Sequence, residues 1–303
     1  MATVLALAEK LYAARDELTV DVDIVFYGAG LLGSDGPSHY LSTNLGSADR
    51  EKLILAVSVE DLGGDELLAY FDEVSTAHGK FILDNAAAAG LPQAEGRLDP
   101  ERTTTYGVGQ LLAHALDHGA QRLILGLGGS CTNDGGCGAA AALGVRFYDR
   151  QGRGFVPTGG TLADIEAIDL SGRHPGLRPG VLTVMCDIDN PLYGETGAAY
   201  IFAPQKGADD ACVQRLDAGL RHLAAVLHAQ LGAEVDTLPG GGAAGGFGAG
   251  CAALLCGALR SGITTVLDTV DFDRRAVGCD LVVTGEGSFD AQSLGGKAIS
   301  GVA

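Results

Sequence analysis

The sequence RLILGLGGSCTNDGG (residues 122–136) joins a short apolar run directly to a loop of glycines and an acid. The same transition occurs twice more, where VLTVM (181–185) precedes CDIDNPLYG (186–194) and where LVV (281–283) precedes TGEGSFDAQSLGGK (284–297). Short apolar runs bounded by turn residues are typical of buried strands. In open α/β folds, ligands bind beyond the carboxyl ends of the strands. Three such ends predict a metal-assisted phosphate site, although Gly, Asn and Asp are also ordinary turn formers.

The composition restricts the class of protein and of partner. The chain is 47% hydrophobic and 19% charged, which indicates a globular protein. Its 303 residues leave room for one large domain or two ordinary ones. A net charge of −18 argues against nucleic acid and against an anionic membrane surface. Any phosphate site must therefore be locally positive, through lysines, helix N-termini or bound cations.

The cysteines and the hydropathy pattern favour a cytoplasmic protein. The seven cysteines contain no CxxC pair and their number is odd, so we expect reduced thiols. Cys251 and Cys256 lie in an apolar stretch, where core packing explains them better than zinc binding. No apolar run approaches the roughly 20 residues of a membrane span. The residues leave the oligomeric state open, with a homo-oligomer among the alternatives.

Periodicity and turn signals alternate along the chain in the order expected of an α/β protein. Helices are predicted at 3–15, 49–58, 65–76, 103–118 and 210–231. A further helix is predicted directly after the glycine loop that ends at Gly136, and another is predicted to run from the glycine-rich stretch at 239–250 to Ala258. Strands are predicted at 20–27, 80–83, 123–125 and 181–185, with valine-rich segments at 265–270 and 281–284. Residues 149–179 form a polar, turn-rich section.

Two short motifs resemble nucleotide-binding loops but lack the features that make them specific. Gly28–Gly33 has the form G-x-G-x-x-G, yet Ser34–Pro37 follows as turn residues where a dinucleotide site needs a helix. An NAD-dependent oxidoreductase that uses this loop is kept as an alternative function. Gly296–Lys297 lacks the first glycine and the final hydroxyl of a P-loop, since Ala291 and Ala298 occupy those positions.

The loop after the strand at 123–125 contains candidate phosphate-binding groups. Its glycines allow successive backbone N–H groups to converge on an oxyanion. The candidates are Gly128, Gly129, Ser130, Thr132 and Asn133. Asp134 precedes the next predicted helix, so it is either a metal or substrate contact or a helix cap.

The loop after the strand at 181–185 contains a candidate magnesium site. Asp187 and Asp189 lie on the same side of an extended segment and repel each other unless a cation or proton lies between them. Mg²⁺ accepts one or two carboxylates and leaves its remaining positions to water and phosphate. Two solvated loop acids are the alternative. Asn190 follows as a candidate substrate contact, and Lys206 is either a phosphate contact or a surface lysine.

Five long stretches, in this order, resemble the glycerate kinase type 1 family. They are AAAAGLPQ…RTTTYGVGQLL (86–112), RLILGLGGSCTNDGGCGAAAALGVRF (122–147), MCDIDNPLYGETGAAYIFAPQKGA (185–208), PGGGAAGGFGAG (239–250) and DLVVTGEGSFDAQSLGGKAISGVA (280–303). The family's serine- and lysine-containing first loop and its C-terminal α/β section have no counterpart here. On this resemblance we expect the chain to lack N-terminal and C-terminal segments of the family.

The resemblance implies a two-domain α/β fold. A mixed-sheet, restriction-endonuclease-like domain is expected at 1–264, with an incomplete flavodoxin-like (Rossmann-type) domain at 265–303. It also implies ATP-dependent phosphorylation of D-glycerate, with 2-phosphoglycerate favoured over 3-phosphoglycerate as product. A truncated, inactive relative is an alternative.

The resemblance also suggests roles for the candidate residues. Asp187 and Asp189 would bind Mg²⁺ or activate the glycerate hydroxyl. The N–H groups of the loop at Gly128–Thr132, with Lys206 and Lys297, would hold phosphates or the carboxylate. Glu286 and Asp290 are further candidates for the base or for metal binding, and Asp290 is grouped with the catalytic residues.

Overall fold

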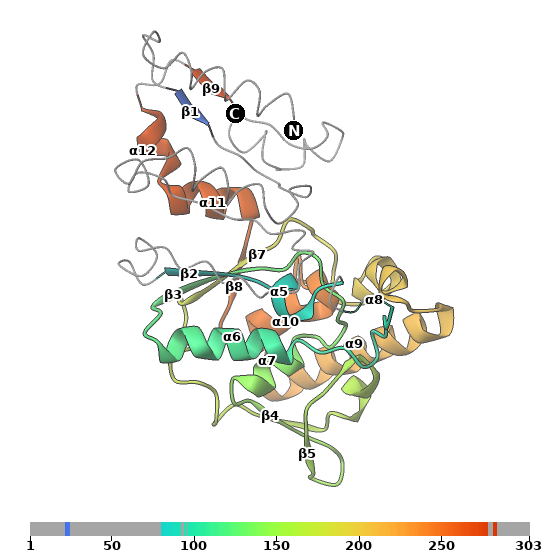
Figure 1. Ribbon diagram of the computed structural model, residues 1–303. Coiled ribbons are helices and arrows are strands. Elements are labelled where there is room, and N and C mark those ends of the chain that lie inside the picture. Colours follow the sequence, from blue (N-terminus) through green and yellow to red (C-terminus); the bar gives the residue numbers. More distant parts are fainter. Residues whose placement is uncertain (1–21, 25–79, 92–93, 95, 278–280, 284–303) are drawn as a thin grey trace. The chain divides into compact units, whose positions relative to one another are not determined.

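The computed structural model describes residues 22–24, 80–91, 94, 96–277 and 281–283 (Figure 1). The predicted helices at 3–15, 49–58 and 65–76 and most of the predicted strand at 20–27 lie outside these residues.

The chain divides into two compact units. One comprises residues 61–260, and the other joins residues 1–60 to residues 261–303. The expected domain boundary at 264 falls inside a helix of the second unit, α11. The assignment of the units to a restriction-endonuclease-like and a flavodoxin-like domain stays a prediction.

The larger unit contains most of the described helices and strands. Its strands are β2 (Lys80–Asp84), β3 (Arg122–Gly126), β4 (Arg146–Tyr148), β5 (Gly154–Phe155), β6 (Ala167–Asp169), β7 (Leu182–Met185) and β8 (Ala258–Arg260). Its helices are α5 (Ala86–Ala89), α6 (Tyr106–Asp117), α7 (Cys137–Ala142), α8 (Ala198–Phe202), α9 (Asp210–Leu231) and α10 (Ala243–Leu254), with 3-10 helices η2 (Gly159–Asp164) and η3 (Pro204–Lys206).

The described part of the smaller unit is short. Strands β1 (Val22–Ile24) and β9 (Leu281–Val283) pair in parallel. Helices α11 (Gly262–Val270) and α12 (Phe272–Ala276) follow β8 in the chain. The valine-rich segment at 265–270 is thus helical, as part of α11, whereas the segment at 281–284 contributes β9.

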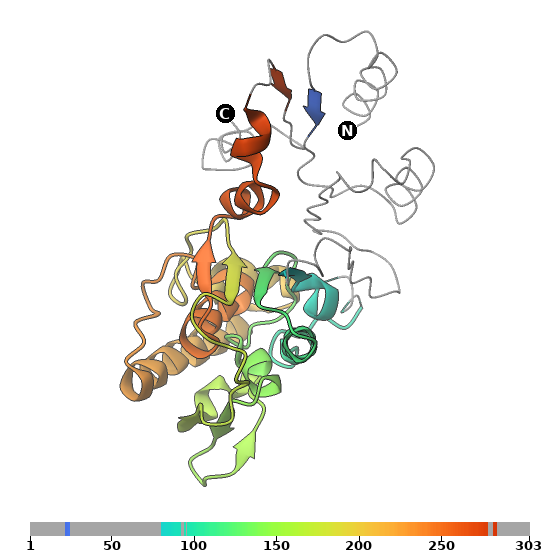
Figure 2. The same ribbon diagram turned by 90° about the vertical axis from the view of Figure 1, so that its left-hand side faces the viewer.

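A parallel sheet with the order β2-β3-β7-β8 forms the framework of the larger unit. The strand order follows the chain order, so each right-handed crossover proceeds in the same direction and places its helices on the same face. Figures 1 and 2 show α6, α7, α9 and α10 on one side of this sheet. The parallel sheet and the interspersed helices confirm the α/β class.

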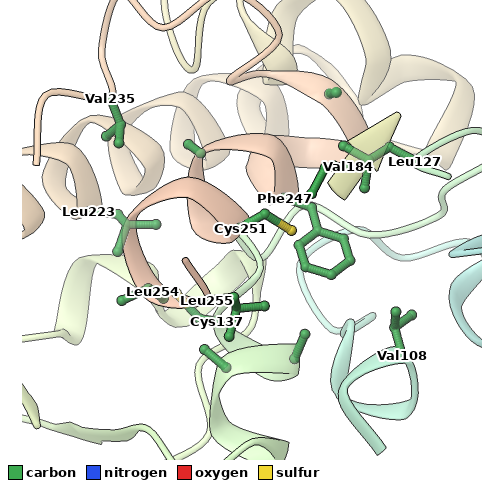
Figure 3. Close-up of a cluster of buried hydrophobic side chains, with 14 of the residues drawn as sticks. Val108, Leu127, Cys137, Val184, Leu223, Val235, Phe247, Cys251, Leu254 and Leu255 are labelled. Atoms are coloured by element: carbon green, nitrogen blue, oxygen red, sulfur yellow. The ribbon is translucent and has the colours of Figure 1, made fainter. Parts of the chain in front are cut away.

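The core lies between this sheet and the helices. Along β7, Leu182 and Val184 are buried while Thr183 and Met185 are partly exposed, so the buried face of the strand is apolar. Figure 3 shows Phe247 and Cys251 of α10 beside Val184, Cys137 and Val108. Cys251 is completely buried, as its predicted role in core packing requires. The six described cysteines are all free thiols.

A second sheet, which the sequence does not predict, begins just before the polar section at 149–179 and continues into it. Strands β5, β4 and β6 form an antiparallel sheet in that order. Phe147 of β4 is buried and pairs with Phe155 of β5. In Figure 1 this sheet lies at the opposite end of the unit from the parallel sheet, with helices between them.

Two predicted helices differ in how well their ends agree with the structure. Helix α9 spans residues 210–231 as predicted, with Asp209 as a side-chain cap accepting from the Cys212 N–H at 2.8 Å. Helix α10 ends at Leu254 rather than at Ala258. The positive φ of Cys256 (56°) turns the chain, and Ala258 begins β8. None of the described helices is long and apolar enough to cross a membrane.

Candidate active site

The carboxyl ends of β2, β3 and β7 lie at one edge of the parallel sheet, because the three strands run in the same direction. The chain continues from β3 into residues 127–136, the glycine loop, and from β7 into residues 186–197, the acidic loop. Two of the three predicted strand-to-loop transitions therefore meet at the expected edge. The third loop, with Glu286, Asp290 and Lys297, lies outside the described residues, as does the Gly28–Gly33 motif.

The glycine loop is exposed at its start and buried over the rest of its length. Gly128 and Gly129 are exposed, whereas every residue from Ser130 to Gly136 is buried. Two backbone hydrogen bonds connect the loop to the end of α5 and the segment after it. The Cys131 N–H donates to the Ala89 carbonyl and the Leu91 N–H donates to the Gly129 carbonyl, both at 2.9 Å. Of the predicted oxyanion-binding positions, Gly128 and Gly129 alone offer their backbone at the surface.

The hydroxyls of Ser130 and Thr132 bond each other inside the loop. Their oxygen atoms are 2.9 Å apart, and Ser130 Oγ also accepts from the Thr132 N–H at 3.1 Å. Both residues are buried. They therefore shape the loop, and a direct contact of either hydroxyl with a ligand stays a prediction.

Asp134 is a buried carboxylate that organises the starts of two helices. Its Oδ2 accepts from the N–H groups of Thr105 and Gly138 at 2.7 and 3.2 Å, and its Oδ1 accepts from the Gly136 N–H at 3.0 Å. The Thr104 and Thr105 hydroxyls donate to Oδ2 at 3.1 and 2.9 Å. Burial raises the pKa of this carboxyl, and the donated hydrogen bonds oppose that shift. Of the two interpretations of Asp134, this geometry supports the cap.

Lys206 is buried rather than on the surface. It ends η3, its side chain is 2% exposed, and Nζ donates to the carbonyl oxygen of Thr132 at 2.6 Å. Burial lowers the pKa of the ammonium to about 8, although Cys131 and Asp134 act to raise it. The alternative that Lys206 is a surface lysine is wrong, because its side chain is buried and its ammonium bonds a backbone carbonyl instead of water.

The two aspartates of the acidic loop are exposed. Asp187 and Asp189 flank the half-buried Ile188, as expected of an extended segment whose alternate side chains share a side. The neighbouring Cys186 donates its Sγ–H to the Ile188 carbonyl at 3.3 Å, and burial raises the pKa of its thiol. Cys186 therefore stays neutral. The carboxylates of Asp187 and Asp189 are exposed at the surface of this loop, and their binding of a metal ion stays a prediction.

Internal contacts hold the acidic loop in shape. The Asn190 amide donates from Nδ2 to the Thr196 carbonyl at 2.8 Å, so this side chain helps to close the loop, and its contact with a substrate stays a prediction. Asp217 of α9 accepts from the Gly194 N–H at 2.6 Å. Arg221 of α9 lies over the ring of Tyr193, 4.2 Å from its centroid. The long helix α9 thus anchors the loop that presents the two aspartates.

A glycine-rich segment, residues 239–246, joins the two loops. The Gly242 N–H donates to the Asn190 carbonyl at 3.0 Å, and the Gly135 N–H donates to the Gly245 carbonyl at 3.1 Å. A methyl group at Gly242 would overlap the Pro191 carbonyl oxygen, and one at Gly245 would overlap that of Thr132. Glycine at these positions therefore allows the segment to lie directly against both loops.

Two buried amides at this edge have no hydrogen-bond partner. Asn85 follows β2 and Asn133 lies in the glycine loop; both are 0% exposed, and their side-chain nitrogen and oxygen atoms have no hydrogen-bond partner among the residues that the structure describes. Asn133 was a sequence candidate. Asn85 was missed, although its place directly after a strand is the signal that indicated the other loops. Thr104 and Thr105, which donate to Asp134, are not among the site residues that the sequence predicts.

Comparison with known proteins agrees with this arrangement. The family model described as "Glycerate kinase family" matches residues 33–303. The chain belongs to the glycerate kinase family. It is 48% identical over 223 residues to "Glycerate kinase" of Bacillus cereus, covering 73% of this chain and 58% of the relative. It is 45% identical over 224 residues to "Glycerate 2-kinase" of Escherichia coli K12, again covering 73% and 58%.

A solved structure is similar over the same extent. It is a putative glycerate kinase 2 from Salmonella typhimurium LT2, with 42% identity and a TM-score of 0.69, covering 74% of this chain and 60% of that one. In these comparisons the chain spans less than two thirds of the length of the glycerate kinase relatives that it matches.

Proposed function

We propose that the protein phosphorylates D-glycerate with ATP as the phosphoryl donor and 2-phosphoglycerate as the product. One observation carries the proposal. The exposed Asp187 and Asp189 follow β7, and the exposed Gly128 and Gly129 follow β3, its neighbour in the parallel sheet. Carboxylates and bare backbone N–H groups at one sheet edge are the groups that a phosphate and a cation need. The names of the relatives from Bacillus cereus and Escherichia coli support glycerate as the acceptor.

The two aspartates fit a magnesium ion by their donor chemistry. Their carboxylates are hard oxygen ligands, and both side chains are exposed. Among the described residues no three His, Cys, Asp or Glu side chains lie close enough together to hold a metal ion, so the two aspartates would need water and phosphate as further ligands. Mg²⁺ is commonly held by one or two carboxylates, with water and phosphate completing its shell. When bound, the ion would offset charge on the transferring phosphoryl group, which a protein with a net charge of −18 cannot do by its overall field.

The chain's own residues supply positioning and proton transfer. The Gly128 and Gly129 N–H groups donate to phosphate or carboxylate oxygens, and Asp187 or Asp189 accepts the proton of the glycerate hydroxyl. Phosphoryl transfer depends mainly on such alignment and on charge offset. Glu286, Asp290 and Lys297 are proposed to complete the site. Asp134 and Asn190 shape it, because their side chains are bonded within the protein.

Product analysis tests the proposal. The purified chain is incubated with D-glycerate, ATP and Mg²⁺, and enolase is added alone or together with phosphoglycerate mutase. Enolase alone consumes 2-phosphoglycerate, whereas 3-phosphoglycerate needs the mutase as well. We expect phosphoenolpyruvate with enolase alone. A signal that requires the mutase would overturn the product. An absence of turnover, with no heat of binding for either substrate in calorimetry, would favour an inactive relative.

A further inference from the structure

Lys206 forms an unusual contact, because a buried ammonium has a neutral carbonyl as its hydrogen-bond partner. Its side chain is 2% exposed, and Nζ lies 2.6 Å from the Thr132 oxygen. Burying a charge is costly unless the charge is paired and hydrogen-bonded. An apolar side chain of similar volume would fill the same space without this cost, and such replacements are often neutral or stabilising. The ammonium is therefore poorly explained by stability alone.

The Thr132 carbonyl is a point where three separate segments meet. Lys206 reaches it from η3. Gly245, in the glycine-rich segment, lies so close to it that a methyl group there would overlap the oxygen. The Gly135 N–H in turn donates to the Gly245 carbonyl at 3.1 Å, which closes the connection back to the glycine loop. A shift of this carbonyl would require a shift of each of these neighbours.

The position of Thr132 in the chain connects this contact to the exposed backbone. Thr132 lies four positions after Gly128, and the intervening Gly129 has a φ of 65° and accepts at its carbonyl from the Leu91 N–H. The Cys131 N–H is held by Ala89 on one side of this point, and Asp134 is held by the helix starts on the other. Between these two anchors, the Thr103 hydroxyl donates to the Cys131 carbonyl at 2.8 Å, and Lys206 adds a charged donor at the next carbonyl, that of Thr132.

We propose that Lys206 is a positioning residue, whose ammonium holds the Thr132 carbonyl and thereby sets the direction of the Gly128 and Gly129 N–H groups. This role differs from the phosphate contact expected from the sequence, because Lys206 acts through the backbone and not on the ligand. The expected effect of Lys206 on turnover rests on the proposed function. The effect on the loop itself is independent of what the loop binds.

The variant Lys206→Met tests this role, with Arg173→Met as the matched control. Arg173 also donates from a cation to a backbone carbonyl, that of Leu254 at 3.1 Å. Leu254 ends the helix that leads into β8, so this contact lies near the amino edge of the sheet, away from the glycine loop. Both variants remove a cation and its hydrogen bond to a backbone carbonyl. In Lys206→Met the bond is lost at the glycine loop, and in Arg173→Met it is lost near the amino edge of the sheet.

Two measurements on the full chain separate positioning from stability. Hydrogen exchange at pH 7, read by mass spectrometry, should show that protection of the bonded amides of Cys131 and Thr132 falls at least about tenfold in Lys206→Met and stays unchanged in Arg173→Met, as expected for the loss of one charge-assisted hydrogen bond. The kcat/KM for glycerate should fall at least about tenfold in Lys206→Met, with a higher KM, while its urea midpoint is not lowered. Arg173→Met should lower the urea midpoint and keep kcat/KM.

The outcomes distinguish this proposal from the proposed function. Unchanged loop protection in Lys206→Met, or an equal loss in both variants, would overturn the positioning role even if the chain phosphorylates glycerate. Reduced protection in Lys206→Met alone would support the role even if the wild-type chain showed no kinase activity. Should Lys206→Met fail to fold, Lys206→Gln, which keeps an N–H donor without the charge, should show an intermediate loss of protection. Full protection in that variant would show that the charge has no part in the tie.

Discussion

Thr105 donates both its backbone N–H and its hydroxyl to one carboxylate oxygen of Asp134, at 2.7 and 2.9 Å. The two residues are 29 positions apart in the chain, and Thr105 directly precedes α6. The Thr105 hydroxyl also accepts from the Ala139 N–H at 2.9 Å, inside α7. Asp134, in the buried part of the glycine loop, therefore joins the start of α6 to the start of α7.

Replacing this carboxylate by an amide should destabilise the larger unit. In Asp134→Asn, one oxygen that accepts hydrogen bonds becomes an NH₂ group facing backbone and hydroxyl donors. We expect the free energy of unfolding to fall by about 2–4 kcal/mol, because several buried donors lose their acceptor. Urea unfolding followed by circular dichroism would measure it. The matched control is Asp164→Asn on the exposed surface of η2, with a change within about 0.5 kcal/mol. Equal stability of the two variants would contradict the central role of Asp134.

The exposed aspartates of the acidic loop should affect catalysis without affecting the fold. In Asp189→Asn, the side chain keeps its size but loses the charge that would accept a proton or hold a cation. We expect kcat to fall at least about 100-fold, as is usual for the loss of a general base, with an unchanged thermal midpoint. Glu195→Gln, an exposed acid of the same loop, serves as the control and should retain activity. Near-wild-type turnover of Asp189→Asn would remove this residue from the chemistry.

Ala244 has a backbone conformation that favours glycine. Its φ and ψ are 52° and 43°, and Gly245 and Gly246 continue this left-handed run before α10 becomes regular. An L-residue costs about 1–2 kcal/mol in this region, and glycine does not. Glycine also loses more backbone entropy on folding, which offsets part of this gain. The net effect expected of Ala244→Gly is therefore a rise of about 0.5 kcal/mol in the free energy of unfolding. Ala249→Gly, a buried position further along the same helix, should instead lower it by about 1 kcal/mol. Chemical unfolding of both variants checks the opposite signs.

The sequence predicts the framework of the site because that information is local. Leu123 to Leu125 is an apolar run ended by glycines, and the structure makes it the inner strand β3. The Asp187–Asp189 alternation predicts two carboxylates on one side, and both are exposed in the loop after β7. Short apolar runs and glycine turns carry such features without reference to distant residues.

What the sequence does not predict depends on contacts between distant residues. Nothing near Lys206 in the chain shows that its ammonium is buried, since its partner Thr132 is 74 positions away. Strand β6 lies in the polar section at 149–179, and its pairing with β4 depends on the buried face that Phe147 of β4 provides. The three-residue strand β8 is too short for its pattern to be recognised. Tertiary packing decides all three.

The pH dependence of global stability should reveal the buried ammonium of Lys206. Burial lowers the pKa of this group from 10.5 to about 8. Between these two pH values the unfolded chain binds the proton and the folded chain does not, so the free energy of unfolding rises with pH in this window. The full effect is at most about 3–4 kcal/mol, from about 1.4 kcal/mol for each pKa unit. Below pH 8 both states are protonated at this residue, and the cost of burying the charge is fully present.

Cysteines such as Cys251 and Cys137, whose thiol pKa values burial raises, act in the opposite direction, because their folded forms keep protons that the unfolded chain loses. The measured quantity is therefore the difference between the wild-type and Lys206→Met urea midpoints at pH 7.5, 8.5 and 9.5. We expect the wild type to gain stability relative to the variant as the pH rises. Parallel curves for the two proteins would show that the ammonium is hydrated in solution, and the buried contact with Thr132 could not then hold the glycine loop.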